Sequence, residues 1–417
     1  MPNWKRTLYI LWVVQFMTTV AMTLGLTFVP FFLEQDPALH VTDPSRKLLF
    51  TSLIFAGPFF TAIIATPFWG WMADRQGRKV QVIRATLGLA VTQILMGVAQ
   101  TPEQLVALRM AQGLVSGVIA ANLGLLSAST PTEHQGYAIS TLQSSNPAGL
   151  IFGPILGGFL ATTFGFRAVY FILGGIVLAM GLLALIMIRE ENFTPTASPN
   201  PFKGIWAALG QAVRVPRLRL AFGTLFIGQL AWTIGQVVFA IYAGKLINDY
   251  VATHDVTRSF WNRDVGFTAI CQTIAGLTNF LMSQYWGRAF DRGTPHLTAR
   301  GAGFLSLGTL ALAFWPPWWG VMLARVSVGA GQGGVQALQY ASISGAVDKD
   351  ERGQFMGLAT ATQHVGNLVG FLGGGALAQV WSESGNFVLT AGLYLSIAVL
   401  ALVYGKRGEA TPPGARQ

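Results

Sequence analysis

The chain has 417 residues, of which 52% are hydrophobic and 11% charged, and its formal net charge is +10. This composition excludes a soluble globular domain and indicates an integral membrane protein. The single cysteine, Cys271, leaves no basis for a disulfide framework or a cysteine metal site, so we expect neither a metal nor a cofactor.

Apolar segments of about 20 residues recur along the whole chain, as transmembrane helices require. Their approximate limits are 7–33, 49–72, 80–99, 104–127, 136–161, 167–188, 218–246, 264–287, 298–315, 317–342, 354–380 and 385–405. We therefore predict an all-α membrane protein with twelve transmembrane helices: a six-helix bundle over residues 1–188, a cytoplasmic linker over 189–217 and a second six-helix bundle over 218–417.

The basic residues predict how the spans are oriented. With both termini cytoplasmic, 19 of the 27 lysines and arginines lie on the cytoplasmic side, six lie outside, and Arg109 and Arg325 lie within spans. An excess of basic residues marks cytoplasmic loops. The sequence thus predicts a multi-pass protein with both termini in the cytoplasm, and the positive charge needs no nucleic-acid partner.

The loop after the second span reads Gly70-Trp-Met-Ala-Asp74-Arg75-Gln-Gly77-Arg78-Lys79. Gly77 allows a turn with positive φ, and Asp74 suits a helix N-terminus or an arginine partner. The loop resembles the signature G-x-x-x-D-R-x-G-R-K of the major facilitator superfamily, with every fixed position present. The resemblance implies two helical bundles around a central cavity. It also implies a cytoplasmic conformational latch made of Gly70, Asp74, Arg75, Gly77, Arg78 and Lys79.

The fourth span carries Arg109, whose charge is costly in hydrocarbon unless it faces a wet cavity or a partner. With Gln112 and Gly113 it resembles the superfamily motif R-x-x-Q-G, whose arginine is tied to proton transfer. Arg109 is therefore a candidate for proton coupling and for the substrate cavity. Snorkelling to the outer interface is the alternative for both Arg109 and Arg325.

The fifth span contains a stripe of glycines that recur every four residues. Gly149, Gly153 and Gly157 form one bare face to which another helix backbone can approach closely, and Pro154 favours a bend. With Gly158, these residues resemble the G-x-x-x-G-P-x-x-G-G motif of drug:proton antiporters with twelve spans. We expect this helix at the moving interface between the bundles; ordinary packing is the alternative.

The linker contains apolar residues at helical spacing. Phe202, Ile205, Trp206, Leu209 and Val213 predict a helix that lies on the inner leaflet, with a structureless linker as the alternative. The division into two halves is supported by a repeat, because adding 217 to a residue number maps Asp74 onto Asp291, Arg75 onto Arg292 and Gly153 onto Gly370.

Uncharged amides inside the spans suit an adaptable substrate cavity. The cavity candidates are Arg109, Gln143, Asn146, Gln229, Gln236, Arg325, Gln332, Gln336, Gln339 and His364. Hydrogen bonding between helices is the alternative role for the amides. Histidine is the residue type whose ordinary pKa lies near neutral, so His364 is also a coupling candidate, or else a structural histidine.

No acidic residue lies in the interior of a predicted span. The nearest, Glu34 and Asp36, stand at the outer end of the first span and complete the coupling candidates. Exporters of the family that this chain resembles commonly exchange protons for cationic drugs through an embedded carboxylate. A neutral or anionic amphiphile therefore fits the charges of this chain better.

These features together predict a monomeric transporter of a bacterial cytoplasmic (inner) membrane that exports small amphipathic compounds by alternating access. Coupling to protons is expected. A sugar, metabolite or siderophore permease, with or without proton coupling, is the alternative. An enzyme is not expected, because the sequence offers no catalytic motif such as H-E-x-x-H.

Overall fold

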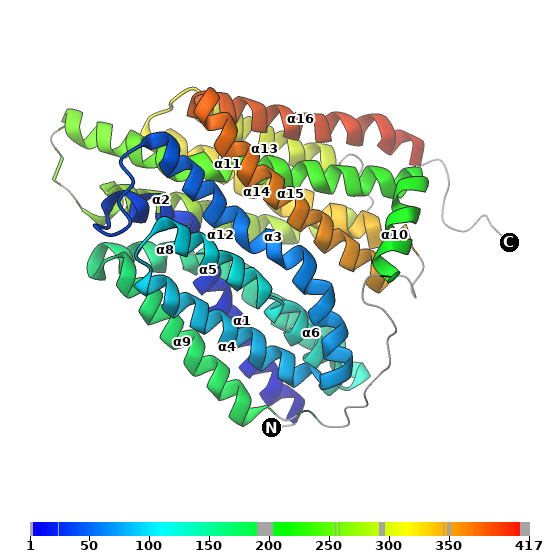
Figure 1. Ribbon diagram of the computed structural model, residues 1–417. Helices are drawn as coiled ribbons and strands as arrows, with labels where there is room; N and C mark the ends of the chain where they lie inside the picture. Colours follow the sequence, from blue (N-terminus) through cyan, green and yellow to red (C-terminus); the bar gives the residue numbers. More distant parts are fainter. Residues whose placement is uncertain are drawn as a thin grey trace. The chain divides into compact units, whose positions relative to one another are not determined.

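The computed structural model describes residues 3–23, 25–188, 190, 203–254, 256–257, 259–291, 297–344, 346–347 and 352–408. Over these residues the chain is helical and contains no strand, as an all-α membrane protein requires (Figure 1). It divides into two compact units, residues 1–202 with 243–273, and residues 203–242 with 274–417. The predicted boundaries of the two bundles stay a prediction.

The first unit contains most of the helices of the N-terminal half. They are α1 (Asn3–Thr23), α2 (Gly25–Gln35), α3 (Pro44–Gln76), α4 (Arg78–Val98), α5 (Pro102–Leu114), α6 (Val118–Ser129), η1 (Thr132–His134), α7 (Gln135–Gln143), α8 (Ser145–Phe164) and α9 (Phe166–Met187). The last part of α11 (Pro216–His254), η2 (Phe260–Asn262) and the first part of α12 (Asp264–Asp291) also belong to this unit.

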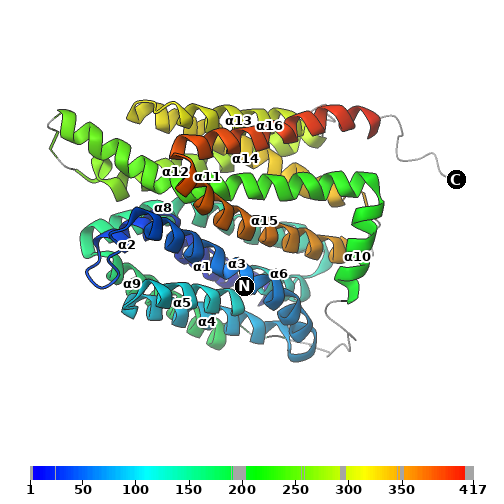
Figure 2. The ribbon, with the colours of Figure 1, turned by 45° about the horizontal axis from the view of Figure 1, so that its top comes forward.

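The second unit contains the rest of α11 and α12. Its other helices are α10 (Lys203–Arg214), α13 (Leu297–Ala313), α14 (Trp318–Ser344), α15 (Arg352–Val380) and α16 (Glu383–Gly408). Within it α13 lies side by side with α14 and α16, and α10 packs on α15 (Figure 2).

Each of the predicted spans coincides with one helix or with two consecutive helices. Among the described residues, eight helical segments are long and apolar enough to cross a membrane, and α1 with α2 adds a ninth span that is bent by 51°. The fourth span is interrupted between α5 and α6, where Gly117 has a φ of 110°. A side chain would be strained at this φ, so the glycine permits the break.

The starts of α3 and α5 follow from local sequence. Asp43 precedes Pro44, and its side chain accepts a hydrogen bond from the Ser45 N–H; Thr101 precedes Pro102, and its hydroxyl accepts one from Gln104. Proline at the first helical position loses no hydrogen bond, and the capping oxygen satisfies an otherwise unpaired donor. These caps fix where the two helices begin, and α3 packs along α5.

The glycine stripe of α8 allows close packing inside the first unit. A Cβ added to Gly149 would lie 2.6 Å from the Thr19 Cβ of α1, and one added to Gly158 would lie 2.6 Å from the Ala269 Cβ of α12. A methyl group at either position would force the helices apart. The glycine stripe therefore packs against α1 at Gly149. At Gly158 it packs against α12, a helix from the second half of the sequence.

The same arrangement recurs in the second unit. A Cβ added to Gly366 of α15 would lie 2.9 Å from the Gln229 Cβ of α11, and one added to Gly374 would lie 2.9 Å from the Ile234 Cα. The eleventh span thus packs on the seventh as the fifth packs on the first. This correspondence matches the sequence repeat.

Residues 203–214 of the linker form helix α10, so the prediction of a helix there is confirmed. Ala208 and Ala212 are buried in a cluster with Phe222 and Phe355, whereas Leu209 and Val213 are exposed. The buried side of α10 attaches the linker to the second unit. Its exposed apolar side chains suit contact with lipid.

Candidate functional site

The latch loop turns at Gly77, which has the expected positive φ of 98° and separates α3 from α4. The carboxylate of Glu190 accepts hydrogen bonds from the backbone N–H groups of Arg78 and Lys79, each 2.9 Å long. It therefore caps the N-terminus of α4, where a negative charge is favoured. A Cβ on Gly77 would lie 2.8 Å from Glu190 Oε2, so the glycine is also needed for this contact.

The basic side chains of the latch are held by different partners. Arg78 Nη1 donates to the Gly124 carbonyl of α6 at 3.1 Å, and the Arg75 guanidinium lies 4.0 Å from the centre of the Trp71 ring. Gly70 has open space where a Cβ would stand. The side chain of Asp74 lies outside the described residues, so its role in the latch stays a prediction.

We expect Glu190→Ala to lower the stability of the protein by about 1–2 kcal/mol, because two N–H groups of α4 lose their acceptor. The measurement is thermal unfolding of the purified protein in detergent. Glu133→Ala is the matched control, because Glu133 is exposed and should change stability by less than about 0.5 kcal/mol. Equal melting temperatures for the two variants would contradict the capping role.

Arg109 is buried in α5 with 6% of its surface exposed. Its Nη1 donates to Gln112 Oε1 of the same helix at 2.8 Å, and its Nε has no hydrogen-bond partner among the described residues. Two residues of the R-x-x-Q-G motif therefore contact each other. The burial favours a role inside the protein over snorkelling.

The third motif residue, Gly113, lies against α3. A Cβ at Gly113 would collide with the Pro58 carbonyl oxygen and with the Thr61 hydroxyl. That hydroxyl donates to the Met110 carbonyl at 2.6 Å. The glycine thus lets α5 approach α3 closely enough for this hydrogen bond, which positions Arg109 one turn earlier on α5.

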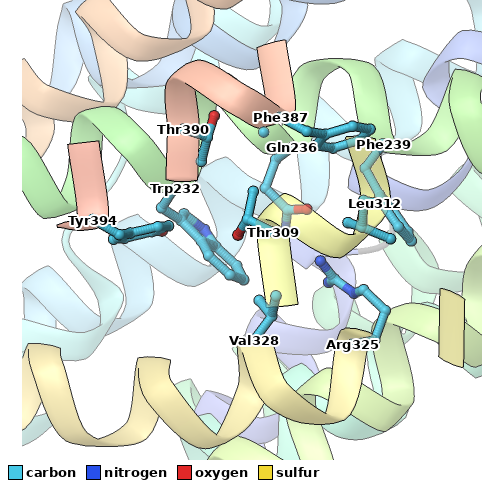
Figure 3. A pocket seen from close by; sticks show the side chains of 11 residues that line it. Trp232, Gln236, Phe239, Thr309, Leu312, Arg325, Val328, Phe387, Thr390 and Tyr394 are labelled. Carbon is cyan, nitrogen blue, oxygen red and sulfur yellow. The ribbon is translucent and has the colours of Figure 1, made fainter. Parts of the chain in front are cut away.

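A small pocket in the second unit brings together two of the predicted cavity residues, Gln236 and Arg325 (Figure 3). Helices α11, α13, α14 and α16 line it. The lining side chains that Figure 3 labels are Trp232, Gln236, Phe239, Thr309, Leu312, Arg325, Val328, Phe387, Thr390 and Tyr394. The aromatic residues of this pocket were not among the sequence-based candidates, because aromatic side chains occur throughout membrane spans and carry no distinguishing spacing.

The remaining amides have varied surroundings. Gln339 Nε2 donates to the Thr224 carbonyl at 2.7 Å, and Asn146 accepts from the Thr19 hydroxyl at 2.8 Å, so both join two helices. Gln229 is buried, Gln332 and Gln336 are half-buried and Gln143 is exposed. Gln339 and Asn146 thus form hydrogen bonds between helices, which is the alternative role that the sequence analysis gave for the amides.

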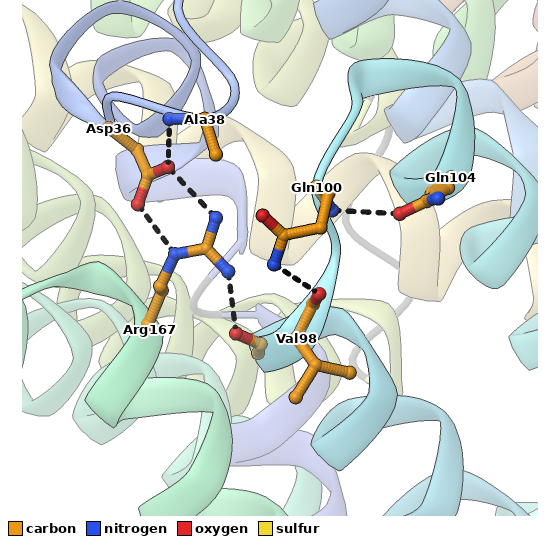
Figure 4. A network of polar contacts seen from close by, with 7 residues as sticks. Asp36, Ala38, Val98, Gln100, Gln104 and Arg167 are labelled. Atoms are coloured by element: carbon orange, nitrogen blue, oxygen red, sulfur yellow. Dashed lines mark hydrogen bonds and ion pairs between the residues drawn. The ribbon is translucent and has the colours of Figure 1, made fainter.

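Asp36 forms a bidentate ion pair inside the first unit (Figure 4). Arg167 Nε donates to its Oδ2 at 2.8 Å and Nη2 donates to its Oδ1 at 2.9 Å, while Nη1 donates to the Gly97 carbonyl. Burial alone would raise the pKa of the Asp36 carboxyl. The hydrogen bonds from Arg167 and Ala38 outweigh it, so the pKa is lowered. These contacts favour a structural role in joining the ends of α2, α4 and α9.

We expect Asp36→Asn to destabilise the protein by about 1–3 kcal/mol at neutral pH, because Arg167 loses its counter-ion. The lowered pKa means that the carboxylate stabilises the fold above its ordinary pKa. This contribution disappears only as the pH falls through the lower folded value.

The measurement is the melting temperature as a function of pH. Wild type should lose more stability than Asp36→Asn below about pH 4 and show no such difference between about pH 6 and 8. Glu34→Gln is the control, because Glu34 pairs with Lys47 at 2.8 Å while 52% of its side chain is exposed. An exposed pair contributes about 1 kcal/mol or less. A larger loss for Glu34→Gln than for Asp36→Asn would contradict this account.

His364, the last coupling candidate, is half-buried on α15. Sequence reasoning did not assign roles to Glu190 and Arg167, although both are charged residues next to span ends. Their partners are distant in sequence, and only the packed structure brings them together. In the sequence, the one feature that could have pointed to Glu190 and Arg167 was a charged residue at the end of a span.

Comparisons with known proteins match nearly the whole chain to membrane transporters. The family described as Major Facilitator Superfamily matches residues 11–251 and 258–417. Multidrug resistance protein MdtG of Salmonella typhimurium is 30% identical over 403 residues, which cover 95% of each chain, and MdtG of Salmonella arizonae matches equally. Among solved structures, the nucleoside transporter NupG has a TM-score of 0.77 at 14% identity and covers 96% of this chain and 99% of that one. A POT family transporter in complex with 5-aminolevulinic acid has a TM-score of 0.73 at 14% identity, over 96% of both chains.

Proposed function

Because the chain belongs to the major facilitator superfamily, we propose that it exports small amphipathic compounds from the cell by proton-coupled alternating access. As a member of this family, the chain is a multi-pass membrane transporter and not an enzyme. The observation that carries the proposal of export is the full-length similarity to multidrug resistance proteins.

The distribution of charge supports the proposed orientation and substrate. Of the 27 basic residues, 19 lie on one side of the predicted spans and six on the other, which favours cytoplasmic termini in a bacterial inner membrane. The buried cations Arg109 and Arg325, together with buried amides, suit neutral or anionic amphiphiles better than cations. A single chain contains both halves of the sequence repeat, so we propose that a monomer carries out alternating access.

The proposed cycle uses the latch of residues 70–79 on the cytoplasmic side and the glycine-lined helices α8 and α15. The contact of Gly158 with Ala269 supports a role for α8 at the boundary between the halves of the sequence. Arginine does not release its proton. Of the coupling candidates, His364 is the one inside a span that can take up and release a proton, so we propose it as the proton carrier, with Arg109 as the fixed charge near the proton's path.

A drug-susceptibility panel in an efflux-deficient bacterium tests export. The panel contains neutral, anionic and cationic amphiphiles, and expression of the wild type should raise the inhibitory concentration of several neutral or anionic compounds. Asp74→Asn, expressed to the same level in the membrane, should abolish this resistance. If the wild type protects against no compound of the panel, the proposal of multidrug export fails.

A sugar, metabolite or siderophore permease remains the second candidate, because the predicted spans have no acidic residue in their interior. Counterflow in proteoliposomes separates the two. A permease exchanges one class of polar compound at equal rates with and without a pH gradient, whereas the proposed exporter accepts unrelated amphiphiles and responds to the gradient.

A further inference from the structure

We infer that the corner between α10 and α11 binds an anionic phospholipid, whose phosphate contacts exposed arginines while its acyl chains lie against exposed apolar side chains. We call residues 209–219 the linker corner. The corner belongs to the connection between the sixth and seventh predicted spans, so the proposed orientation places it at the cytoplasmic leaflet. Binding of this lipid goes beyond transport and needs no exported compound.

Helix α10 is fixed at the ends of two spans of the second unit. Figures 1 and 2 both show α10 lying across the ends of α11 and α15. Its Ala208 and Ala212 are buried in a cluster that includes Phe222 of α11 and Phe355 of α15. The chain turns where Pro216 begins α11, because proline cannot donate the hydrogen bond that would continue α10. The predicted seventh span begins two residues later, so the linker corner stands at the edge of the membrane.

One side of the linker corner is apolar and exposed. Leu209 is 38% exposed, Val213 is 59% exposed and Val215 is 41% exposed. Leu209 and Val213 are four residues apart, so they lie on one face of the helix, next to the buried alanines. A helix with such a face, placed at the ends of membrane spans, is buried as far as the boundary between headgroups and acyl chains.

The linker corner also carries three exposed arginines that have no counter-charge among the described residues. Arg214 is the last residue of α10, and Arg217 and Arg219 are among the first four residues of α11. Their side chains form no ion pair or hydrogen bond within the part of the chain that the structure describes. Residues 192–248 contain no acidic side chain. The dipole of α11 disfavours cations at its start, so we expect the compensating negative charge to come from outside the protein.

An anionic phospholipid complements both parts of the linker corner. A guanidinium donates parallel hydrogen bonds to phosphate oxygens, which suits arginine to phosphate groups. Near a negatively charged membrane, each basic residue strengthens binding ~5-fold. Phosphatidylcholine also has a phosphate, but its choline cancels the charge, so the corner should prefer an anionic lipid. Inorganic phosphate has no acyl chains for the exposed apolar side chains to contact.

Native mass spectrometry of the full-length protein in a non-ionic detergent tests the inference, because the measured mass counts both bound lipids and copies of the chain. Phosphatidylglycerol is the probe, and phosphatidylcholine with the same acyl chains is the control. Wild type should bind phosphatidylglycerol at least ~10-fold more tightly than phosphatidylcholine. Equal affinity for the two lipids would overturn the inference.

Paired variants locate the binding surface. Arg214→Gln should weaken phosphatidylglycerol binding ~5-fold, and Arg214→Gln/Arg217→Gln should weaken it ~20-fold. Arg288→Gln/Arg300→Gln is the matched control, because it removes two exposed arginines of the same unit outside the linker corner and should leave the preference in place. All four side chains are exposed, so the variants should melt like wild type. Equal losses in the two double variants would mean that the attraction is general and that the corner is no site.

The apolar part of the linker corner is tested by Leu209→Ser/Val213→Ser, which should weaken the binding of both lipids. If wild type is instead a dimer that this variant converts to a monomer, the apolar side chains join two copies of the chain and the inference is wrong. It is also wrong if inorganic phosphate, at constant ionic strength, displaces phosphatidylglycerol from wild type. Binding is measured without transport, so its failure is separate from a failure of export in cells.

Discussion

Replacing Arg109 by glutamine is expected to abolish export and, at the same time, to make the protein more stable. Arg109 is 6% exposed, donates to Gln112 of its own helix and forms no ion pair with any described residue. A buried charge of this kind costs several kcal/mol. Its removal should therefore stabilise the fold by about 1–3 kcal/mol, because functional sites retain groups that stability alone would not select.

Two measurements on the same variant test this expectation: resistance conferred on efflux-deficient cells and thermal unfolding of the purified protein. Arg109→Lys retains the charge and should retain part of the resistance. Arg46→Gln, at an exposed arginine, is the control that should change neither quantity. Lower stability with undiminished export would show that Arg109 is a structural residue.

Replacing Gly113 by alanine is expected to destabilise the protein by about 1–3 kcal/mol, the usual range for overpacking at a tight contact. The added Cβ would collide with the Pro58 carbonyl oxygen, which belongs to the backbone of α3 and cannot rotate away. It would also displace the Thr61 hydroxyl from the Met110 carbonyl. Because α5 must then move away from α3, Arg109 also moves, and export should fall together with stability.

Gly175→Ala is the matched control for Gly113→Ala. Gly175 lies within α9 and has no atom within 4 Å of an added Cβ. Alanine in an uncrowded helix interior should stabilise by about 0.5–1 kcal/mol. Melting temperatures of the two variants should therefore move in opposite directions. A neutral Gly113→Ala would mean that α3 and α5 do not pack as closely as the structure has them.

The positions of the spans and their helical structure could be predicted from sequence, because each span depends mainly on its own residues. Each apolar segment must satisfy its backbone hydrogen bonds internally, and a helix is the structure that does so. The turn at Gly77 was predictable for the same reason, since it depends on one residue. The helix over 203–214 followed from the spacing of Leu209 and Val213, although the residues buried on its packed side are Ala208 and Ala212.

The contacts that build the candidate site could not be predicted in this way. Glu190 is more than 100 residues from the N–H groups that it caps, with separations of 112 and 111. The pairing of Asp36 with Arg167 spans 131 residues. Both pairings depend on which helices become neighbours, and no spacing within one helix encodes this. The sequence did, however, identify Arg109 and Arg325 as unusual, and both are buried.

Their burial connects the fold with the proposed function. An arginine that only extends to the membrane surface would be exposed, whereas Arg109 and Arg325 are 6% and 3% exposed. They stand at nearly equivalent positions of the sequence repeat, 216 residues apart. Each half of the transporter thus retains one costly cation in the interior of a span. We attribute its retention to substrate binding and coupling.

Proton movement in everted membrane vesicles tests the central claim, export coupled to protons, most directly. Vesicles that contain the protein are acidified inside, and a pH-sensitive dye reports the gradient when an amphipathic compound is added. Wild type should dissipate the gradient in a manner that depends on the compound, and Arg109→Gln should not. Accumulation of the compound at the same rate with and without the gradient, and with no dye response, would contradict the account.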